Sequence, residues 1–213
     1  MAANADETSV PQNESNPKPA GGLLRRAVKA AVFALAALVV SPLILITWLE
    51  SVLTRGEAVF LTCAQLLAPM PGPPGVKLRG AFYWATLADC SWETSIGFGS
   101  VFTHRGAVLA ANVSMGSYCV IGHANLGSGV MMGSRVSIPS GKRQHFGESG
   151  GIVAEARYDT VTIGAGCWIG EAAVILADVG EGSIVSAGAV IVKAMAGRSV
   201  IGGNPAQVLR SLA

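Results

Sequence analysis

The sequence predicts a mainly β protein: a parallel β-helix preceded by a membrane-associated helical segment. Two observations predict this class. In the second half of the chain an apolar side chain recurs every six residues, often followed by glycine, and near the N-terminus residues 30–49 carry no charge. Half of the residues are hydrophobic (51%) and only 13% are charged, which excludes a wholly disordered chain. The net charge of +2 provides no concentrated basic face, so no nucleic-acid partner is expected.

Residues 1–22 are predicted to form a disordered tail. This segment is polar, contains proline and has almost no large apolar side chains. Such a segment cannot bury enough surface to offset the entropy that ordering would cost.

Residues 23–76 are predicted to form a membrane-associated helical region. The uncharged run over 30–49 matches the hydrocarbon thickness of a bilayer, basic residues precede it, and Trp48 lies at its far end. A re-entrant helix is one possible topology, because Ser41-Pro42 interrupts helical hydrogen bonding in the middle of the run. A hairpin is a second, with the uncharged residues 58–76 as the return arm or an interfacial helix, and a single span is a third.

Residues 77–213 are predicted to form the β-helix, because a period of six fits neither an amphipathic helix nor a simple alternating strand. Residues 77–95 and 200–213 are expected to cap its two ends, the second as a strand plus a helix. Fourteen apolar positions, three to a coil, predict four to five coils, and small residues four positions later are expected to fill the corners, Cys119 and Cys167 among them. The fourteen positions are Ile96, Phe102, Leu109, Met115, Ile121, Leu126, Met132, Ile138, Ile163, Ile169, Ile175, Val179, Val185 and Ile191.

The three histidines are the candidate reactive side chains. His104 and His123 each follow an inward position by two residues and are one coil apart, so their side chains are expected to stack about 5 Å apart on one outer face. The same position one coil later is Ser140, at the base of a long interruption that carries His145. We expect all three histidines to face a substrate cleft; the alternative is that His104 and His123 are surface residues near a neighbouring subunit. The spacing provides no close histidine pair, so no metal is expected.

Three segments give the chain a family resemblance: VTIGAGCWIGEAAVI (161–175), VSAGAVIVKAM (185–195) and GGNPAQVLR (202–210). Together with the hexapeptide series, they resemble the hexapeptide-repeat acyltransferases and are similar to the bacterial sugar and exopolysaccharide O-acetyltransferases. The resemblance implies a left-handed parallel β-helix, a homotrimer, and acetyl-CoA bound as cosubstrate between neighbouring subunits. It also implies that His145, in the extruded loop, is the general base that removes a hydroxyl proton.

The resemblance assigns the cofactor site residue by residue. It implies that the backbone of Ala187 meets the pantetheine arm and that Lys193 and Arg210 approach the CoA phosphates. Trp168 is expected to pack beside the cleft, and the turn containing Asn204 to shape the adenine end.

Together these expectations describe an acyltransferase of the inner membrane whose catalytic domain faces the cytosol, where acetyl-CoA is found. The expected acceptor is a hydroxyl of a sugar in a lipid-linked or surface saccharide. Two alternatives stay open at this point: a non-catalytic solenoid scaffold, and an acyltransferase for a small soluble metabolite such as serine.

Overall fold

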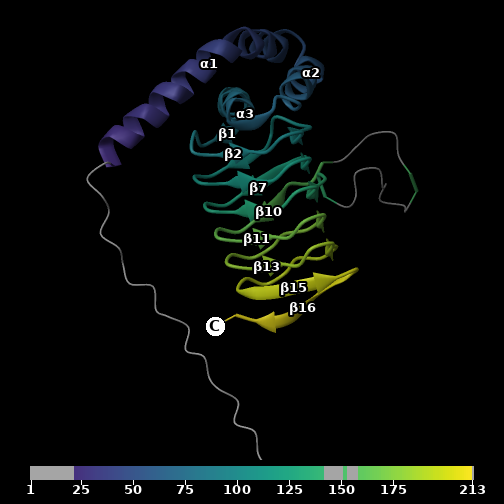
Figure 1. Cartoon of the computed structure of the whole chain (residues 1–213). Coiled ribbons are helices and arrows are strands. Elements are labelled where there is room, and N and C mark those ends of the chain that lie inside the picture. The colour runs from purple at the N-terminus through teal and green to yellow at the C-terminus, as the bar shows by residue number, and fades with distance from the viewer. Residues whose placement is uncertain (1–21, 142–150, 153–157, 213) are drawn as a thin grey trace, which may run out of the picture.

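The computed structural model describes residues 22–141, 151–152 and 158–212. Within these residues three helices precede sixteen short strands: α1 (Gly22–Leu53), α2 (Ala58–Leu67) and α3 (Gly72–Thr86). The helices form a layer over one end of a stack of coils, and the chain ends at the opposite end of the stack (Figure 1).

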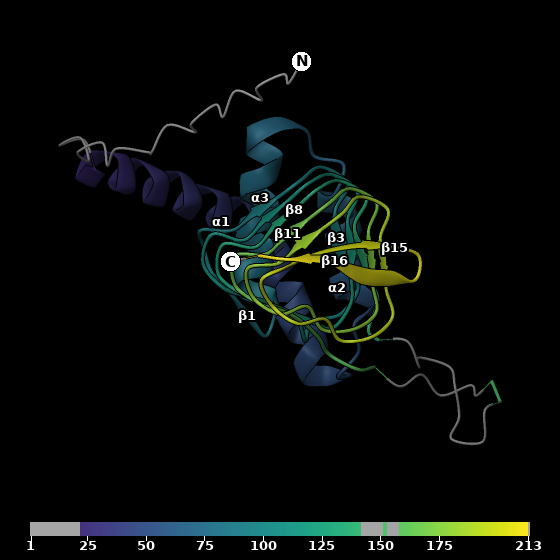
Figure 2. The ribbon, with the colours of Figure 1, turned by 90° about the horizontal axis from the view of Figure 1, so that it is seen from below.

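The strands form three sheets that wind around one core. The first contains β1 (Asp89–Cys90), β4 (Val108–Leu109), β7 (Ala124–Leu126) and β10 (Val161–Ile163). The second contains β2 (Ser95–Ile96), β5 (Ser114–Met115), β8 (Met131–Met132), β11 (Trp168–Ile169), β13 (Ile184–Val185), β15 (Ser199–Gly203) and β16 (Ala206–Ser211). The third contains β3 (Val101–Phe102), β6 (Val120–Ile121), β9 (Ser137–Ile138), β12 (Val174–Ile175) and β14 (Val190–Ile191). Seen end-on, the coils superimpose and α1 extends to one side (Figure 2).

The parallel β-helix predicted from the period of six is confirmed. All fourteen predicted inward side chains are buried, and so are Cys119 and Cys167 in the corners. The stack is longer than the predicted four to five coils, because six strands of the second sheet, β2 to β15, pair in parallel. The six-residue count missed the ends, where Cys90, Met195 and Ile201 continue the buried series.

Glycine at the corners allows the coils to stack closely. A Cβ at Gly116 would lie 2.6 Å from the carbonyl carbon of Gly133 in the next coil. Gly116→Ala is therefore expected to lower the free energy of unfolding by about 3 kcal/mol, since backbone atoms have to move.

Gly129→Ala is the matched control for this prediction. Gly129 has a φ of +70°, and a Cβ at this position would have no atom of the described residues within 4 Å. Only the left-handed backbone opposes the substitution, at a cost of about 1 kcal/mol. Chemical denaturation of both variants measures the difference, and equal losses would contradict the packing argument.

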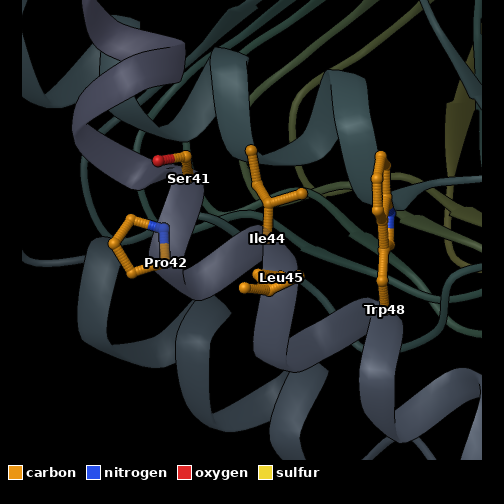
Figure 3. A pocket seen from close by; sticks show the side chains of 5 residues that line it. All are labelled: Ser41, Pro42, Ile44, Leu45 and Trp48. Carbon is orange, nitrogen blue, oxygen red and sulfur yellow. The ribbon is translucent and has the colours of Figure 1, made fainter.

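Helix α1 continues through Pro42, and a side chain replaces the hydrogen bond that this proline removes. Proline has no N–H for the carbonyl of Leu38, four residues earlier. The hydroxyl of Ser41 donates to that carbonyl at 2.8 Å. A hollow of about 490 Å³ follows the Pro42 turn, lined by Ser41, Pro42, Ile44, Leu45 and Trp48 (Figure 3).

One face of α1 packs on the protein and the other is exposed. The buried face runs from Ala36 to Glu50, and the indole N–H of Trp48 donates to the carbonyl of Ala85, at the end of α3, at 2.8 Å. The exposed large apolar side chains are Leu23, Leu24, Val28, Val32, Leu35, Leu38, Val39, Leu45, Ile46, Trp48, Leu49, Val52 and Leu53. By length and composition α1 is able to cross a membrane, which by itself is weak evidence for membrane association.

The caps differ from the predicted ones. Helix α3 covers the first coil and runs through the boundary expected between 76 and 77, because Pro73 and Pro74 start this helix rather than only ending the preceding one. The predicted cap at 77–95 was wrong in part, since β1 and β2 already belong to the first coil. The predicted C-terminal helix was also wrong: β15 and β16 form an antiparallel hairpin over the last coil.

Candidate active site

The predicted stacking of His104 and His123 is confirmed. Strand β3 pairs with β6 so that Phe102 lies beside Ile121, and each histidine follows two residues later. The two imidazole rings are 4.8 Å apart between centroids and tilted by 36°. The next coil brings Ser140 to the same column, where its hydroxyl oxygen accepts the backbone N–H of His123 at 2.8 Å.

A carboxylate from the helical layer holds His104. Nδ1 of His104 lies 2.7 Å from Oε2 of Glu57, in the turn between α1 and α2. The other oxygen of Glu57 accepts the backbone N–H of Arg105 at 2.9 Å, which fixes the carboxylate. A carboxylate at Nδ1 favours the tautomer with the proton on that nitrogen, so Nε2 is left as a hydrogen-bond acceptor.

A second carboxylate, Glu50, holds the turn itself. Its two oxygens accept the backbone N–H groups of Val59 and Phe60 at 2.7 and 3.1 Å, which satisfies the first turn of α2. Oε2 of Glu50 also accepts a hydrogen bond from Nη2 of Arg105 at 2.6 Å. Glu50 and Arg105 are largely buried, so the α1–α2 turn is tied to the corner between β3 and β4 by charge as well as by packing.

His123 lies deeper in the same cluster. Its ring stacks on Tyr158 at 5.7 Å, and a Cβ at Gly106 would lie 2.5 Å from its Nδ1, so this ring fits only beside glycine. Burial lowers the pKa of His123 below its ordinary value of 6.5; the neighbouring His104 lowers it further, and the Glu57 carboxylate acts in the opposite direction.

The lowered pKa of His123 predicts a pH dependence of stability. The unfolded chain binds a proton at this histidine more readily than the folded chain does. The contribution of neutral His123 to the free energy of unfolding is therefore complete above pH 6.5. It is lost as the pH falls through the lower pKa of the folded state. His123→Gln is expected to flatten the fall in unfolding free energy between pH 7.5 and pH 5, measured by chemical denaturation. Curves that run parallel to wild type would contradict this.

The long interruption leaves and rejoins the β-helix at this cluster. Gly141 follows Ser140 on one side of the interruption, and on the other side the ring of Tyr158 lies 4.4 Å from that of His104. The backbone N–H of Asp159 donates to the carbonyl of Ser140 at 3.0 Å, which closes the base of the loop. His145, Glu148 and Glu155 lie outside the described residues, so the role of His145 stays a prediction.

The residues predicted to bind the cofactor are exposed and belong to different sheets and corners of the β-helix. Lys193 follows β14 by two residues, in the column that contains Ser140 and the two histidines. Trp168 lies on β11, in the second sheet, and Ala187 follows β13 in that sheet. Asn204 and Arg210 lie in the terminal hairpin. Within one chain, the structure does not bring these five residues together.

No group of three or more potential metal ligands occurs among residues 22–141, 151–152 and 158–212. The histidine pair and Glu57 form a hydrogen-bonded cluster. Such a cluster is able to bind hydroxyl groups and to accept their protons.

Sequence reasoning missed the carboxylate partner of His104. Glu57 is 47 residues from His104 and belongs to the helical region, so no local spacing relates the two. One signal was present: Glu50 and Glu57 are the only acids between residues 23 and 76, and acids inside an apolar segment require partners.

Several solved structures share this arrangement of sheets. A maltose O-acetyltransferase from Clostridium difficile 630 superimposes with a TM-score of 0.63 at 18% identity, over 74% of this chain and 87% of that chain. This chain has the fold of a hexapeptide-repeat acetyltransferase. A hexapeptide-repeat acetyltransferase from Vibrio cholerae superimposes with a TM-score of 0.58 at 18% identity, over 72% of this chain and 89% of that one. A hexapeptide-repeat acetyltransferase from V. cholerae O1 biovar eltor, complexed with acetyl-CoA, superimposes with a TM-score of 0.52 at 16% identity. The match covers 76% of this chain and 92% of that chain.

No family model and no curated protein matches the sequence. At these identities the structural similarity establishes the fold.

Proposed function

We propose that this protein is a membrane-associated acyltransferase that moves an acetyl group from acetyl-CoA to a hydroxyl of a membrane-tethered saccharide. The observation that carries the proposal is the Glu57–His104–His123 cluster, located on an acetyltransferase fold at the corner where the 142–157 segment leaves the coils. The fold supports acyl transfer, and the helical layer supports a substrate held at the membrane.

In the proposed reaction, His145 and His104 have different roles. His145 accepts the proton of the acceptor hydroxyl as its oxygen attacks the thioester carbonyl. The tetrahedral intermediate then collapses, the C–S bond breaks, and the departing thiolate of CoA takes that proton from the imidazolium. Nε2 of His104 accepts a hydrogen bond from a neighbouring acceptor hydroxyl, in an orientation that Glu57 sets.

The packing of α1 supports an insertion into one leaflet rather than a full crossing. The contacts of α1 with the rest of the protein begin by Phe33, so at most residues 22–32 project freely. These residues span about 16 Å, less than the roughly 30 Å of a hydrocarbon core. The exposed apolar face covers the entire helix, so a re-entrant or interfacial placement buries it and keeps both helix ends on the cytosolic side.

The location of Glu57 supports a tethered acceptor. Only three residues separate it from Leu53, the exposed apolar end of α1. A saccharide carried by a lipid in the same leaflet therefore reaches the His104 side of the β-helix directly.

A homotrimer is part of the proposal, and the distribution of the expected cofactor residues supports it. Trp168 lies on the second sheet and Lys193 in the corner that follows the third sheet, so a groove between neighbouring chains would combine them. Trp168 is also paired with Met131 in the second sheet, and both are about half exposed, at 50% and 54%. Covering this apolar strip favours association of the flat faces.

Glu57→Gln is expected to raise the acceptor KM about tenfold, with a smaller change in kcat and no change in the KM for acetyl-CoA. The neutral amide no longer holds the tautomer and orientation of His104, whereas the cofactor contacts are unaffected. Glu57→Asp is expected to recover part of the loss. Glu181→Gln, at an exposed position, is the matched control. If the Glu57→Gln enzyme has wild-type acceptor kinetics, His104 does not bind the acceptor.

Acetyl transfer by the full chain in lipid nanodiscs tests the proposal. The acceptors are a polyprenyl-diphosphate-linked hexose, the same hexose free in solution, and serine; thiol release and product mass are the readouts. We expect transfer to the tethered hexose above all. Transfer to serine alone favours the soluble-metabolite alternative, and the absence of any transfer favours the scaffold.

Protease treatment of inside-out membrane vesicles tests the orientation. Because the cytosolic side faces outward in such vesicles, digestion of the β-helix is expected. Protection of the β-helix in intact vesicles would overturn the cytosolic placement.

A further inference from the structure

Two hollows on the side of the molecule where α1 meets α3 share one lysine. The first is an apolar groove of about 460 Å³ between the two helices, lined by Val32, Leu35, Ala36, Val39, Pro73, Pro74, Lys77 and Leu78. The second is a smaller polar pocket of about 130 Å³, lined by Lys29, Phe33, Lys77, Trp92, Glu93, Thr94, Ser95 and Asn112. Lys77 lies at the junction of the two hollows.

The polar pocket has an excess of positive charge. Lys29 comes from α1 and Lys77 from α3, while Glu93 is the one acid in the lining. Among the described residues neither lysine forms an ion pair. Lys77 is also only partly exposed, and its ammonium group has no counter-ion among the described residues. An anion in this pocket would supply that counter-charge, and the Ser95 hydroxyl and Asn112 amide provide further donors.

Aromatic side chains surround the same place. Phe33 makes edge-to-face contacts with Trp84 at 5.6 Å and with Trp92 at 6.0 Å. Tryptophan together with lysine is typical of the level at which lipid headgroups meet the hydrocarbon. This composition fits a position at headgroup depth, and the apolar groove extends from the pocket along α1.

We propose that these hollows bind one anionic phospholipid, with an acyl chain in the α1–α3 groove and the phosphate between Lys29 and Lys77. The proposal rests on the membrane association in the proposed function. A zwitterionic lipid carries its own cation and gains less from two lysines, and a free phosphate leaves the groove unfilled. The bound lipid would hold the N-terminal part of α1 against α3.

Native mass spectrometry of the full chain in detergent tests this, with phosphatidylglycerol and phosphatidylcholine as the probes. One phosphatidylglycerol is expected to bind, about tenfold more tightly than phosphatidylcholine, and glycerol 3-phosphate, which has no chain, is not expected to displace it. Lys29→Gln/Lys77→Gln is expected to abolish the preference. Arg25→Gln/Arg26→Gln removes the same amount of charge from α1, outside the pocket, and is expected to retain the preference.

A second pair of variants tests the groove. Val39→Gln places a polar group in the groove, whereas Leu38→Gln places one on an exposed neighbour outside it. Only Val39→Gln is expected to weaken phosphatidylglycerol binding. Equal binding of the two lipids would overturn the proposal. So would an equal loss of preference in the double lysine variant and in the double arginine variant. Acetyl transfer is measured on the same samples, so a chain that binds the lipid without transferring acetyl groups would refute the function and not the lipid site.

Discussion

Arg79→Met should lower the free energy of unfolding by about 3–5 kcal/mol, because it removes the N–H groups that donate to four carbonyls at once. Arg79 is fully buried on α3. Its Nη1 donates to the carbonyls of Leu67, Ala68 and Met70 at 3.2, 3.1 and 2.8 Å, which satisfies the C-terminal end of α2. Its Nε donates to the carbonyl of Ile96, in the first coil, at 3.0 Å.

The charge of Arg79 has no acidic partner among the described residues, and burial lowers the pKa of its guanidinium. One side chain thus joins α2, α3 and the β-helix through carbonyl oxygens. Arg79→Lys is expected to lower the free energy of unfolding by less than Arg79→Met does, since an ammonium group reaches some but fewer of these oxygens. Arg210→Met, at an exposed position, is the control, and chemical denaturation of the detergent-solubilised chain is the measurement. A loss below about 1 kcal/mol for Arg79→Met would show that the joint depends on apolar packing alone.

His145→Ala should lower kcat for acetyl transfer by about 10²- to 10⁴-fold, the usual contribution of a general base. The KM values should change little, because the lost interaction forms as the proton moves. His104→Ala provides the contrast: an acceptor-binding histidine should act mainly on the acceptor KM. The pair of variants therefore separates proton transfer from acceptor binding.

A pH profile distinguishes a missing base from a misfolded loop. The wild-type rate should rise with pH as the base loses its proton and then level off, and His145→Ala should lose this rise. If His104→Ala removes the rise instead, the Glu57–His104 pair is the base, and His145 has another role. Unchanged rates in both variants would end the histidine mechanism.

The hexapeptide period alone was enough to predict the β-helix and which of its side chains face inward. Direction along a strand alternates with each residue, and a coil repeats its corners, so inward and outward positions follow from local spacing. The same regularity placed His104 above His123. It failed at the ends of the stack, where the anchors Cys90 and Met195 are neither aliphatic nor followed by glycine.

Contacts between the helical layer and the first coil were decided by the tertiary structure. Glu57 reaches His104, Glu50 reaches Arg105, and Arg79 reaches Ile96 across 47, 55 and 17 residues. No period relates a helix surface to a β-helix corner, so these partners depend on how three helices pack. The sequence by itself determined the repeating core and the histidine column. Only the fold decided which carboxylate holds the column, because that contact joins two elements whose periods are unrelated.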